Sequence, residues 1–274
     1  MVRLANILLP VDFSERSMDA ARQADVLARH FHSEVTVLHV VDPQERESGR
    51  FERDGVKVTE LETLLVRGFT GASVRQIIRD GDPTRNILDF TESNDVDLVV
   101  MASHGYGPFH SFLMGSVTAE VERRARCPVW VTAHTPQEPP LAFRTVLCAV
   151  DLNAGADWDN IVEWAKEFAA AFMARIIVVY VIRELDSGDE PSFPGDWLGQ
   201  VERQEIDRIK QELGKEGQVL LVGGDVPEAV CSQAKKLHAD LLVIGRSPKA
   251  GSLGTAHTTS FTIIRESPCS VVSI

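Results

Sequence analysis

Short runs of Val, Ile and Leu alternate with longer amphipathic stretches along the whole chain. The runs predict strands buried on both faces, and the stretches, with apolar residues recurring every three or four positions, predict helices. In the first half this predicts strand Ile7–Val11, helix Ser14–Phe31, strand Glu34–Val41, helix Val56–Val66, strand Ser73–Ile78, helix Thr84–Asn94, strand Asp97–Ala102, helix Ser116–Arg126 and strand Pro128–Val131. Such an alternation indicates an α/β fold with a parallel, doubly wound sheet.

Segments of the first half return in the same order in the second half. The pairs are Asp97–Ala102 with Asp240–Gly245, Asp12 with Asp151, Gly81-Asp82-Pro83 with Gly224-Asp225, and Cys127 with Cys269. The offset is close to half the chain length each time, which indicates a duplicated domain. We expect domains at residues 1–135 and 144–274, joined by a short, stiff, proline-containing linker at 136–143.

The junction that follows Asp97–Ala102 carries the strongest functional signal. The strand ends in a small residue and Gly105, and after an intervening loop Gly115-Ser116 opens the next helix. Small residues let the backbone approach a ligand, and the N-terminus of a helix favours an anion. This predicts a phosphate site whose N–H and hydroxyl donors come from Gly115, Ser116, Val117 and Thr118. The simpler alternative is a helix start with Gly115 or Ser116 as its N-cap and no ligand.

The spacing from Ala102 through Gly105 to Gly115-Ser116 resembles the G-x2-G-x9-G-[S/T] nucleotide signature of the universal stress protein (UspA) family, with alanine at the first glycine. The resemblance implies two tandem Rossmann-like domains of the adenine-nucleotide-hydrolase-like type. It also implies that the first domain binds ATP, with any Mg²⁺ carried by the nucleotide. The site residues would be Pro10, Val11, Asp12, Val40, Met101, Ala102, His104, Gly105, Gly115, Ser116, Val117 and Thr118.

Asp12 and His104 each have an alternative role that needs no ligand. Asp12 follows the first strand, where the family has an aspartate near the adenine and ribose, but Asp12 or Ser14 would equally serve as a helix cap. The equivalent Asp151 shows that the fold alone could keep an aspartate there, whereas the nearby glycine loop favours the ligand role. His104 either contacts a phosphate or faces water.

The second half departs further from the signature. Gly245 keeps the first glycine, but Pro248 replaces the second and His257-Thr258 replaces Gly-Ser. Proline has no N–H to donate, and histidine adds bulk where a bare backbone is needed. We expect this second site to be lost, with a shifted loop at Gly251–Thr255 as the alternative.

Composition narrows the class of protein. With 44% hydrophobic and 25% charged residues the chain is typical of a globular protein, and a net charge of −12 disfavours nucleic acid as the main partner. No apolar run reaches the length of a membrane span, and the N-terminus lacks a signal-peptide pattern. The four cysteines form no CxxC pair, which suggests free thiols in a reducing cytosol. We find no P-loop, no metal-ligand cluster and no catalytic base, so any ATP hydrolysis would be slow.

The first hypothesis is therefore a cytoplasmic stress-response protein that acts as a nucleotide-dependent regulatory module. The alternatives are a nucleotide-independent interaction scaffold and a slow ATPase. Pro128 and Pro268 begin the last strand of each half, as in edge strands. Because the last strand mediates dimers in the resembled family, the two halves are expected to pair about a pseudo-two-fold axis through a surface that includes Trp130; a homodimer also remains open. Asp42–Gly55 and Arg183–Gly199 are either flaps or surface loops.

Overall fold

The computed structural model comprises two compact units. One runs from Arg3 to Leu141 and is called the N-terminal unit; the other, the C-terminal unit, holds Ala142–Ile274 with Met1–Val2. The structure describes residues 2–41, 63, 65, 67–103, 114–133, 142–152, 158–182, 198–214, 217–246 and 259–274.

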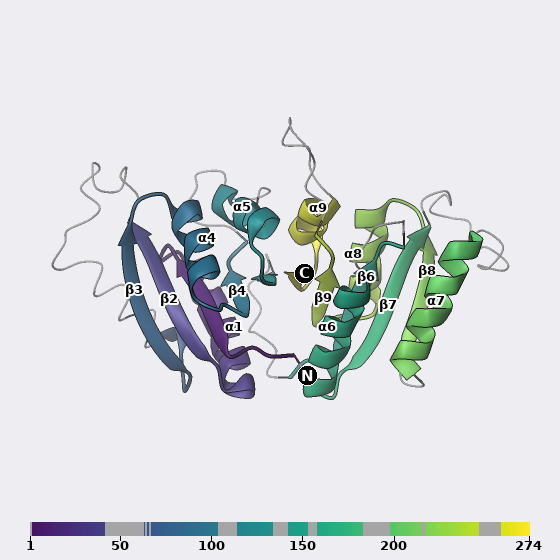
Figure 1. Ribbon diagram of the computed structural model, residues 1–274, viewed down its shortest axis with the longest axis horizontal. Helices are drawn as coiled ribbons and strands as arrows, with labels where there is room; N and C mark the ends of the chain where they lie inside the picture. The colour runs from purple at the N-terminus through teal and green to yellow at the C-terminus, as the bar shows by residue number, and fades with distance from the viewer. Residues whose placement is uncertain are drawn as a thin grey trace. The chain divides into compact units, whose positions relative to one another are not determined.

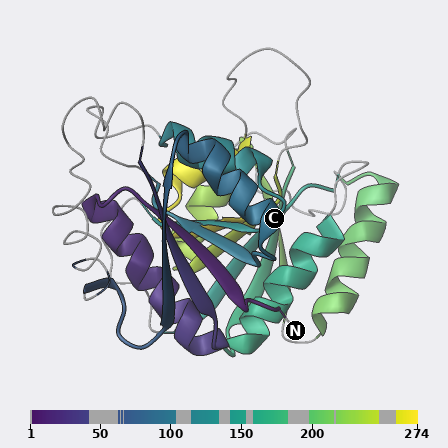
Figure 2. The ribbon, with the colours of Figure 1, turned by 60° about the vertical axis from the view of Figure 1, so that its left-hand side comes forward.

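The N-terminal unit contains five parallel strands in the order β3-β2-β1-β4-β5 (Figure 1). They are β1 (Asn6–Val11), β2 (Glu34–Val41), β3 (Ser73–Asp80), β4 (Leu98–Met101) and β5 (Val129–Val131). The helices described in full are α1 (Glu15–Phe31), α4 (Pro83–Ser93) and α5 (Ser116–Arg124). Most of the predicted helix Val56–Val66 lies outside the described residues. The direction of winding reverses between β1 and β4, so right-handed connections place α1 on one face of the sheet and α4 and α5 on the other (Figure 2).

The C-terminal unit repeats this order as β8-β7-β6-β9-β10, again with all neighbours parallel. Its strands are β6 (Thr145–Val150), β7 (Arg175–Ile182), β8 (Gln218–Gly223), β9 (Leu241–Ile244) and β10 (Ser270–Ser273). Its helices are α6 (Trp158–Ala171), α7 (Gln200–Leu213), α8 (Val226–Lys236) and α9 (Thr259–Glu266). The predicted fold class, two doubly wound parallel α/β domains in tandem, is confirmed.

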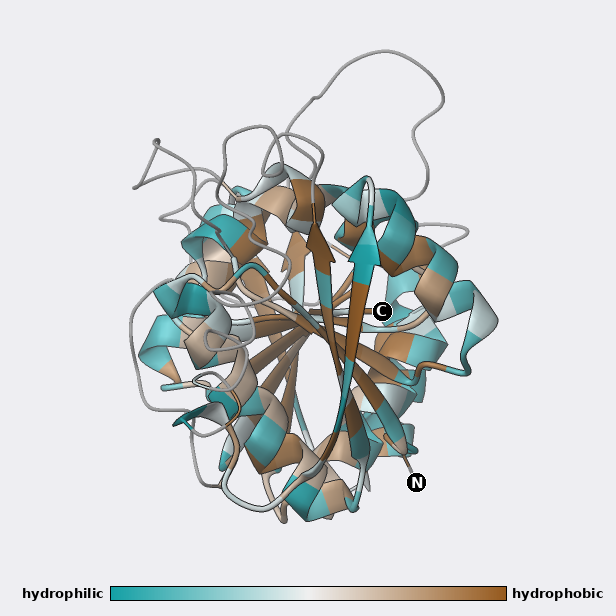
Figure 3. Ribbon diagram, turned by 90° about the vertical axis from the view of Figure 1, so that its left-hand side faces the viewer, coloured by the Kyte–Doolittle hydropathy of each residue, from teal (hydrophilic) through white to brown (hydrophobic). Residues whose placement is uncertain are grey.

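The core of each unit follows from the apolar runs. Ile7, Leu8 and Leu9 of β1 are at most 1% exposed, and all four residues of β4 and of β9 are buried. Helices lie on both faces of the central strands, which therefore need no polar face, whereas the outer strand β3 carries polar residues and is partly exposed. Figure 3 shows mostly brown, hydrophobic strands inside and teal, hydrophilic residues on the helices outside.

The duplication extends to individual hydrogen bonds. Asp97 Oδ2 accepts the Asn6 N–H at 2.9 Å, and Asp240 Oδ2 accepts the Thr145 N–H at 2.9 Å. Each bond fastens the residue before the fourth strand of a unit to the start of its first strand. The structure thus repeats not only the elements but also the contacts that hold their ends.

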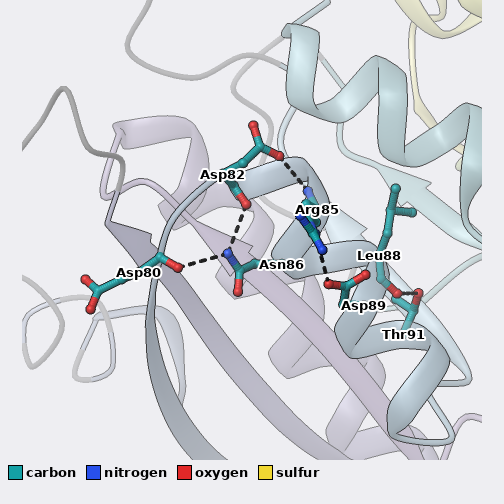
Figure 4. Close-up of polar contacts among 7 residues, drawn as sticks. All are labelled: Asp80, Asp82, Arg85, Asn86, Leu88, Asp89 and Thr91. Carbon is teal, nitrogen blue, oxygen red and sulfur yellow. Dashed lines mark hydrogen bonds and ion pairs between the residues drawn. The ribbon is translucent and has the colours of Figure 1, made fainter.

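The turn before α4 is repeated before α8. Gly81 and Gly224 have φ of +120° and +117°, values that favour glycine, and the aspartates that follow them cap α4 and α8. In the first unit Asp82 Oδ1 accepts the Arg85 N–H at 2.7 Å, and Asn86 Nδ2 donates to the backbone oxygen of Asp82 at 3.0 Å (Figure 4). The Gly-Asp signature seen in both halves of the sequence is therefore a turn and helix cap.

The four cysteines are free thiols, as expected, and Trp130 lies in the core. Cys148 and Cys269 are buried, Cys127 and Cys231 are half-buried, and all four are free thiols. Burial raises the pKa of the Cys269 thiol to about 12. Trp130 in β5 is fully buried. The pairing of the two halves through this strand stays a prediction.

Candidate functional site

The winding of the N-terminal unit brings the candidate residues of three strands to one edge of the sheet. β1 pairs with β4 through Ile7–Leu98 and Leu8–Val99, so Asp12 and Ala102 follow adjacent strand ends. In open parallel sheets, ligands bind outside the carboxyl ends at such a reversal of strand order. The predicted residues at these ends are Pro10, Val11 and Asp12 at β1, Val40 at β2, and Met101 and Ala102 at β4.

Three of these strand-end residues are apolar and buried. Val11, Val40 and Met101 are 7%, 8% and 5% exposed. They lie on the three central strands, β1, β2 and β4. Apolar residues beside a few placed polar groups are the usual composition of a small-molecule site.

Asp12 is held by two serines in a compact turn. Its Oδ1 accepts the Ser14 N–H at 3.1 Å, the Ser14 hydroxyl at 2.7 Å and the Ser17 hydroxyl at 2.5 Å. Ser14 is the N-cap of α1, since its Oγ accepts the Ser17 N–H at 3.2 Å. The capping role that was open between Asp12 and Ser14 therefore belongs to Ser14, and Asp12 orients the cap.

The segment between β4 and α5 is tied at its base by two hydrogen bonds. The Gly115 N–H donates to the Ser103 backbone oxygen at 2.9 Å, and the Thr118 hydroxyl donates to the Ala102 backbone oxygen at 3.0 Å. Both donors were predicted to face a phosphate. In the structure they fix the position of α5 relative to the end of β4 instead.

The first turn of α5 still offers donors to an anion. Gly115 is the N-cap, and no side chain caps this end of the helix. The N–H groups of Ser116, Val117 and Thr118 come before the first intrahelical bond, which runs from the Ala119 N–H to the Gly115 oxygen at 2.9 Å. Ser116 is exposed, and His104 and Gly105 lie outside the described residues.

Two residues of this site were missed by the sequence analysis. Ser17 binds Asp12 as described above, and its place three residues after Ser14 on a helix start was the available signal. His39, buried in β2, places Nδ1 2.9 Å from the Val11 backbone oxygen. Nothing local in the sequence indicates that contact, because it depends on the register of β1 and β2.

The C-terminal unit differs in sequence from the N-terminal unit at the helix that follows its aspartate. His32 and Met173 have φ of 56° and 54° and stand at the same place before the second strand of each unit. Trp158 stands as many residues before Met173 as Ser17 stands before His32, so it occupies the position of Ser17 in the C-terminal unit. Asp151 is exposed and Trp158 is buried.

Gly245 has a packing role that explains the exchange of glycine and alanine between the units. A Cβ at Gly245 would meet Ile161 Cδ1 of α6 at 2.6 Å. By the same count, the residue of α1 that matches Ile161 is Ala20, which is fully buried. A small residue at position 20 is consistent with the methyl group of Ala102 in the N-terminal unit. The remaining residues of the second loop, Pro248, Gly251–Thr255 and His257-Thr258, lie outside the described residues.

The described ranges contain neither a membrane-spanning helix nor a cluster of metal ligands. Within them, no helix combines the length and the apolar character needed to cross a bilayer. In that same part of the chain, no group of three or more His, Cys, Asp or Glu side chains is placed to hold a metal ion.

Known proteins match both halves of the chain. The Universal stress protein family matches residues 4–133 and again residues 142–274. Two universal stress proteins of Methanocaldococcus jannaschii are similar to this chain. MJ0531 is 29% identical over 48% of this chain and 84% of its own length, and MJ0577 is 30% identical over 47% of this chain and 95% of its own length.

Solved structures show the same fold over the full length. A universal stress protein from Archaeoglobus fulgidus superposes with a TM-score of 0.71 at 23% identity, covering 99% of this chain and 96% of that one. A universal stress protein solved in complex with cAMP is 24% identical over 47% of this chain, with a TM-score of 0.35. Two family matches that together span nearly the whole sequence, on two units with one topology, show that this chain belongs to the universal stress protein family, with two of its domains in tandem.

Proposed function

We propose that the N-terminal unit binds an adenine nucleotide, with ATP as the first candidate, and that the protein acts as a nucleotide-dependent regulatory module in the cytoplasm. The observation that carries this proposal is the uncapped first turn of α5 at the same sheet edge as Asp12. Three backbone N–H groups and the helix dipole favour phosphate there. The Asp12 carboxylate, already oriented by serine hydroxyls, is suited to accept hydrogen bonds from ribose hydroxyls.

The remaining strand-end residues suit the rest of a nucleotide. Val11, Val40 and Met101 are apolar and would lie against the base. His104 and Gly105, which lie outside the described residues, stay candidates for binding the nucleotide on the strength of the sequence alone. No step of turnover is assigned. Phosphoryl transfer needs a base or a water-orienting group, and none of the residues described at this edge fills that role.

One alternative has an observation in its favour. The Gly115 N–H and the Thr118 hydroxyl are already bonded within the protein, as expected for a scaffold that keeps the fold without a ligand. Measurement of ligand content separates the two functions. We expect native mass spectrometry of the freshly purified chain to show one adenine nucleotide per chain.

A matched pair of variants locates the nucleotide. Asp12→Ala should weaken ATP binding at least tenfold, because a ribose hydrogen bond to a charged group contributes about 1.5–3 kcal/mol. Asp151→Ala removes the equivalent carboxylate of the C-terminal unit and should leave the affinity unchanged. A chain that is empty and does not bind added Mg-ATP would leave the scaffold as the function. Two nucleotides per chain would show that the C-terminal unit also has a working site.

A further inference from the structure

His39 contacts the residues on both sides of Asp12, the backbone of Val11 and the side chain of Phe13. The parallel register of β1 and β2 places it beside Val11. Its Nδ1 lies 2.9 Å from the Val11 oxygen, and since a carbonyl only accepts, Nδ1 carries the proton and donates it. Its ring also packs against the ring of Phe13, with centroids 4.4 Å apart and planes at 42°. One imidazole thus holds the residue before Asp12 and the residue after it.

The turn that carries Asp12 is in an uncommon conformation that needs such support. Phe13 has φ of 61°, a region that a bulky aromatic residue rarely adopts. This conformation lets the chain reverse so that the Asp12 carboxylate meets Ser14 and Ser17. The ring of His39 lies on the side chain of the strained residue itself, and the imidazole is only 2% exposed.

The C-terminal unit provides an internal comparison. There the matching register places Tyr180 beside Val150, at the position of His39. The Tyr180 hydroxyl donates to Glu202 Oε1 of α7 at 2.6 Å. The tyrosine thus connects β7 to a helix, whereas the histidine connects β2 to the turn with the aspartate. The histidine occurs in the unit that also has Ser14 and Ser17, and the tyrosine in the unit that has Trp158 at the place of Ser17.

We infer that His39 is a positioning residue of the nucleotide site: it does not contact the ligand but holds the Val11 backbone and the Phe13 ring on either side of Asp12, so that the carboxylate is oriented before a nucleotide arrives. The inference rests on the proposed function for its effect on affinity. Its structural part, the fixed turn, can be tested without any ligand.

The test compares three chains in two assays. Mg-ATP affinity is measured by calorimetry, and backbone amide exchange is followed over residues 12–17 in the absence of nucleotide. His39→Leu removes the Nδ1 donor and the ring, and should weaken Mg-ATP binding about tenfold while accelerating exchange over 12–17. His39→Asn keeps an N–H donor near the position of Nδ1 and should recover most of the affinity and protection. Tyr180→Phe is the matched control and should change neither readout.

Each outcome decides a different point. If the wild type binds Mg-ATP and His39→Leu binds it equally well, the positioning role is wrong. If affinity falls without faster exchange over 12–17, His39 does not act through the turn, which also overturns the inference. If the wild type binds no nucleotide, the proposed function fails, and exchange alone then decides whether His39 holds the turn. Should His39→Leu fail to fold, His39→Gln, whose amide lies nearer the position of Nε2, replaces it in the comparison with His39→Asn.

Discussion

A negative charge at Ser116 should have opposite effects on folding and on nucleotide binding. Ser116 is exposed and is the first residue of α5, so Ser116→Asp introduces no steric conflict with the core. A carboxylate in the first turn interacts favourably with the helix dipole, which should stabilise the fold by about 0.3–1 kcal/mol. A phosphate bound at the same N–H groups would instead be repelled.

The size of the repulsion follows from Coulomb's law. At a separation of roughly 5 Å and an effective dielectric constant of about 40, each unit of phosphate charge costs about 1.7 kcal/mol. Two such charges would lower the affinity for ATP by more than a hundredfold in the absence of screening, and at least tenfold after screening by salt.

Calorimetric titration with Mg-ATP and urea denaturation of the same variant test both parts. Ser116→Asn is the neutral control of the same shape and should bind within about threefold of the wild type, because it leaves the backbone donors in place. If Ser116→Asp unfolds no more easily than the wild type and also binds Mg-ATP with wild-type affinity, the phosphates do not lie at the N-terminus of α5. The placement of the nucleotide would then be wrong, even if the protein binds one elsewhere.

Three further predictions concern the fold. Burial raises the pKa of the Cys269 thiol from 9.0 to about 12, so on raising the pH the thiol of the unfolded chain loses its proton first. The contribution of this thiol to the free energy of unfolding should therefore fall by about 1.4 kcal/mol per pH unit between pH 9 and pH 12. Cys269→Ala should show a shallower alkaline slope in urea denaturation; an identical slope would contradict the assignment. Gly245→Ala should cost no more than about 1 kcal/mol, because the atom that the new Cβ would meet, Ile161 Cδ1, is the end of a side chain that can turn aside. Ile161→Val, which removes Cδ1, should make the double variant less unstable than the sum of the single changes. Asp82→Ala should cost about 1 kcal/mol of stability because the Arg85 N–H loses its acceptor, whereas Asp82→Asn should cost little; equal losses would exclude the cap as the cause.

The features predicted well from the sequence are those encoded locally. Val, Ile and Leu runs gave the strands, and in a doubly wound sheet the ends of those strands must meet, so Asp12 and Ala102 could be placed at one edge. The recurrence of Gly81-Asp82 as Gly224-Asp225 indicated the duplication, and its role as a turn and helix cap came from the structure.

The features that were missed depend on contacts between distant segments. The hydrogen bond from the Gly115 N–H to the Ser103 backbone oxygen joins the start of α5 to the residues after β4, and neither residue type indicates it. The role of His39 depends on which residue of β1 it faces, a matter of strand register. Ala102 departs from the signature, and the packing that bears on the matching Gly245 involves Ile161, which lies on a different element.

The exchange of Ala102 and Ala20 for Gly245 and Ile161 also bears on how the two halves have diverged. A Cβ at Gly245 would meet Ile161 Cδ1 at 2.6 Å, whereas the residue of α1 that matches Ile161 is the fully buried Ala20. A chimera that carries α6 on the first sheet should therefore need Ile161 to adopt another rotamer beside the methyl group of Ala102.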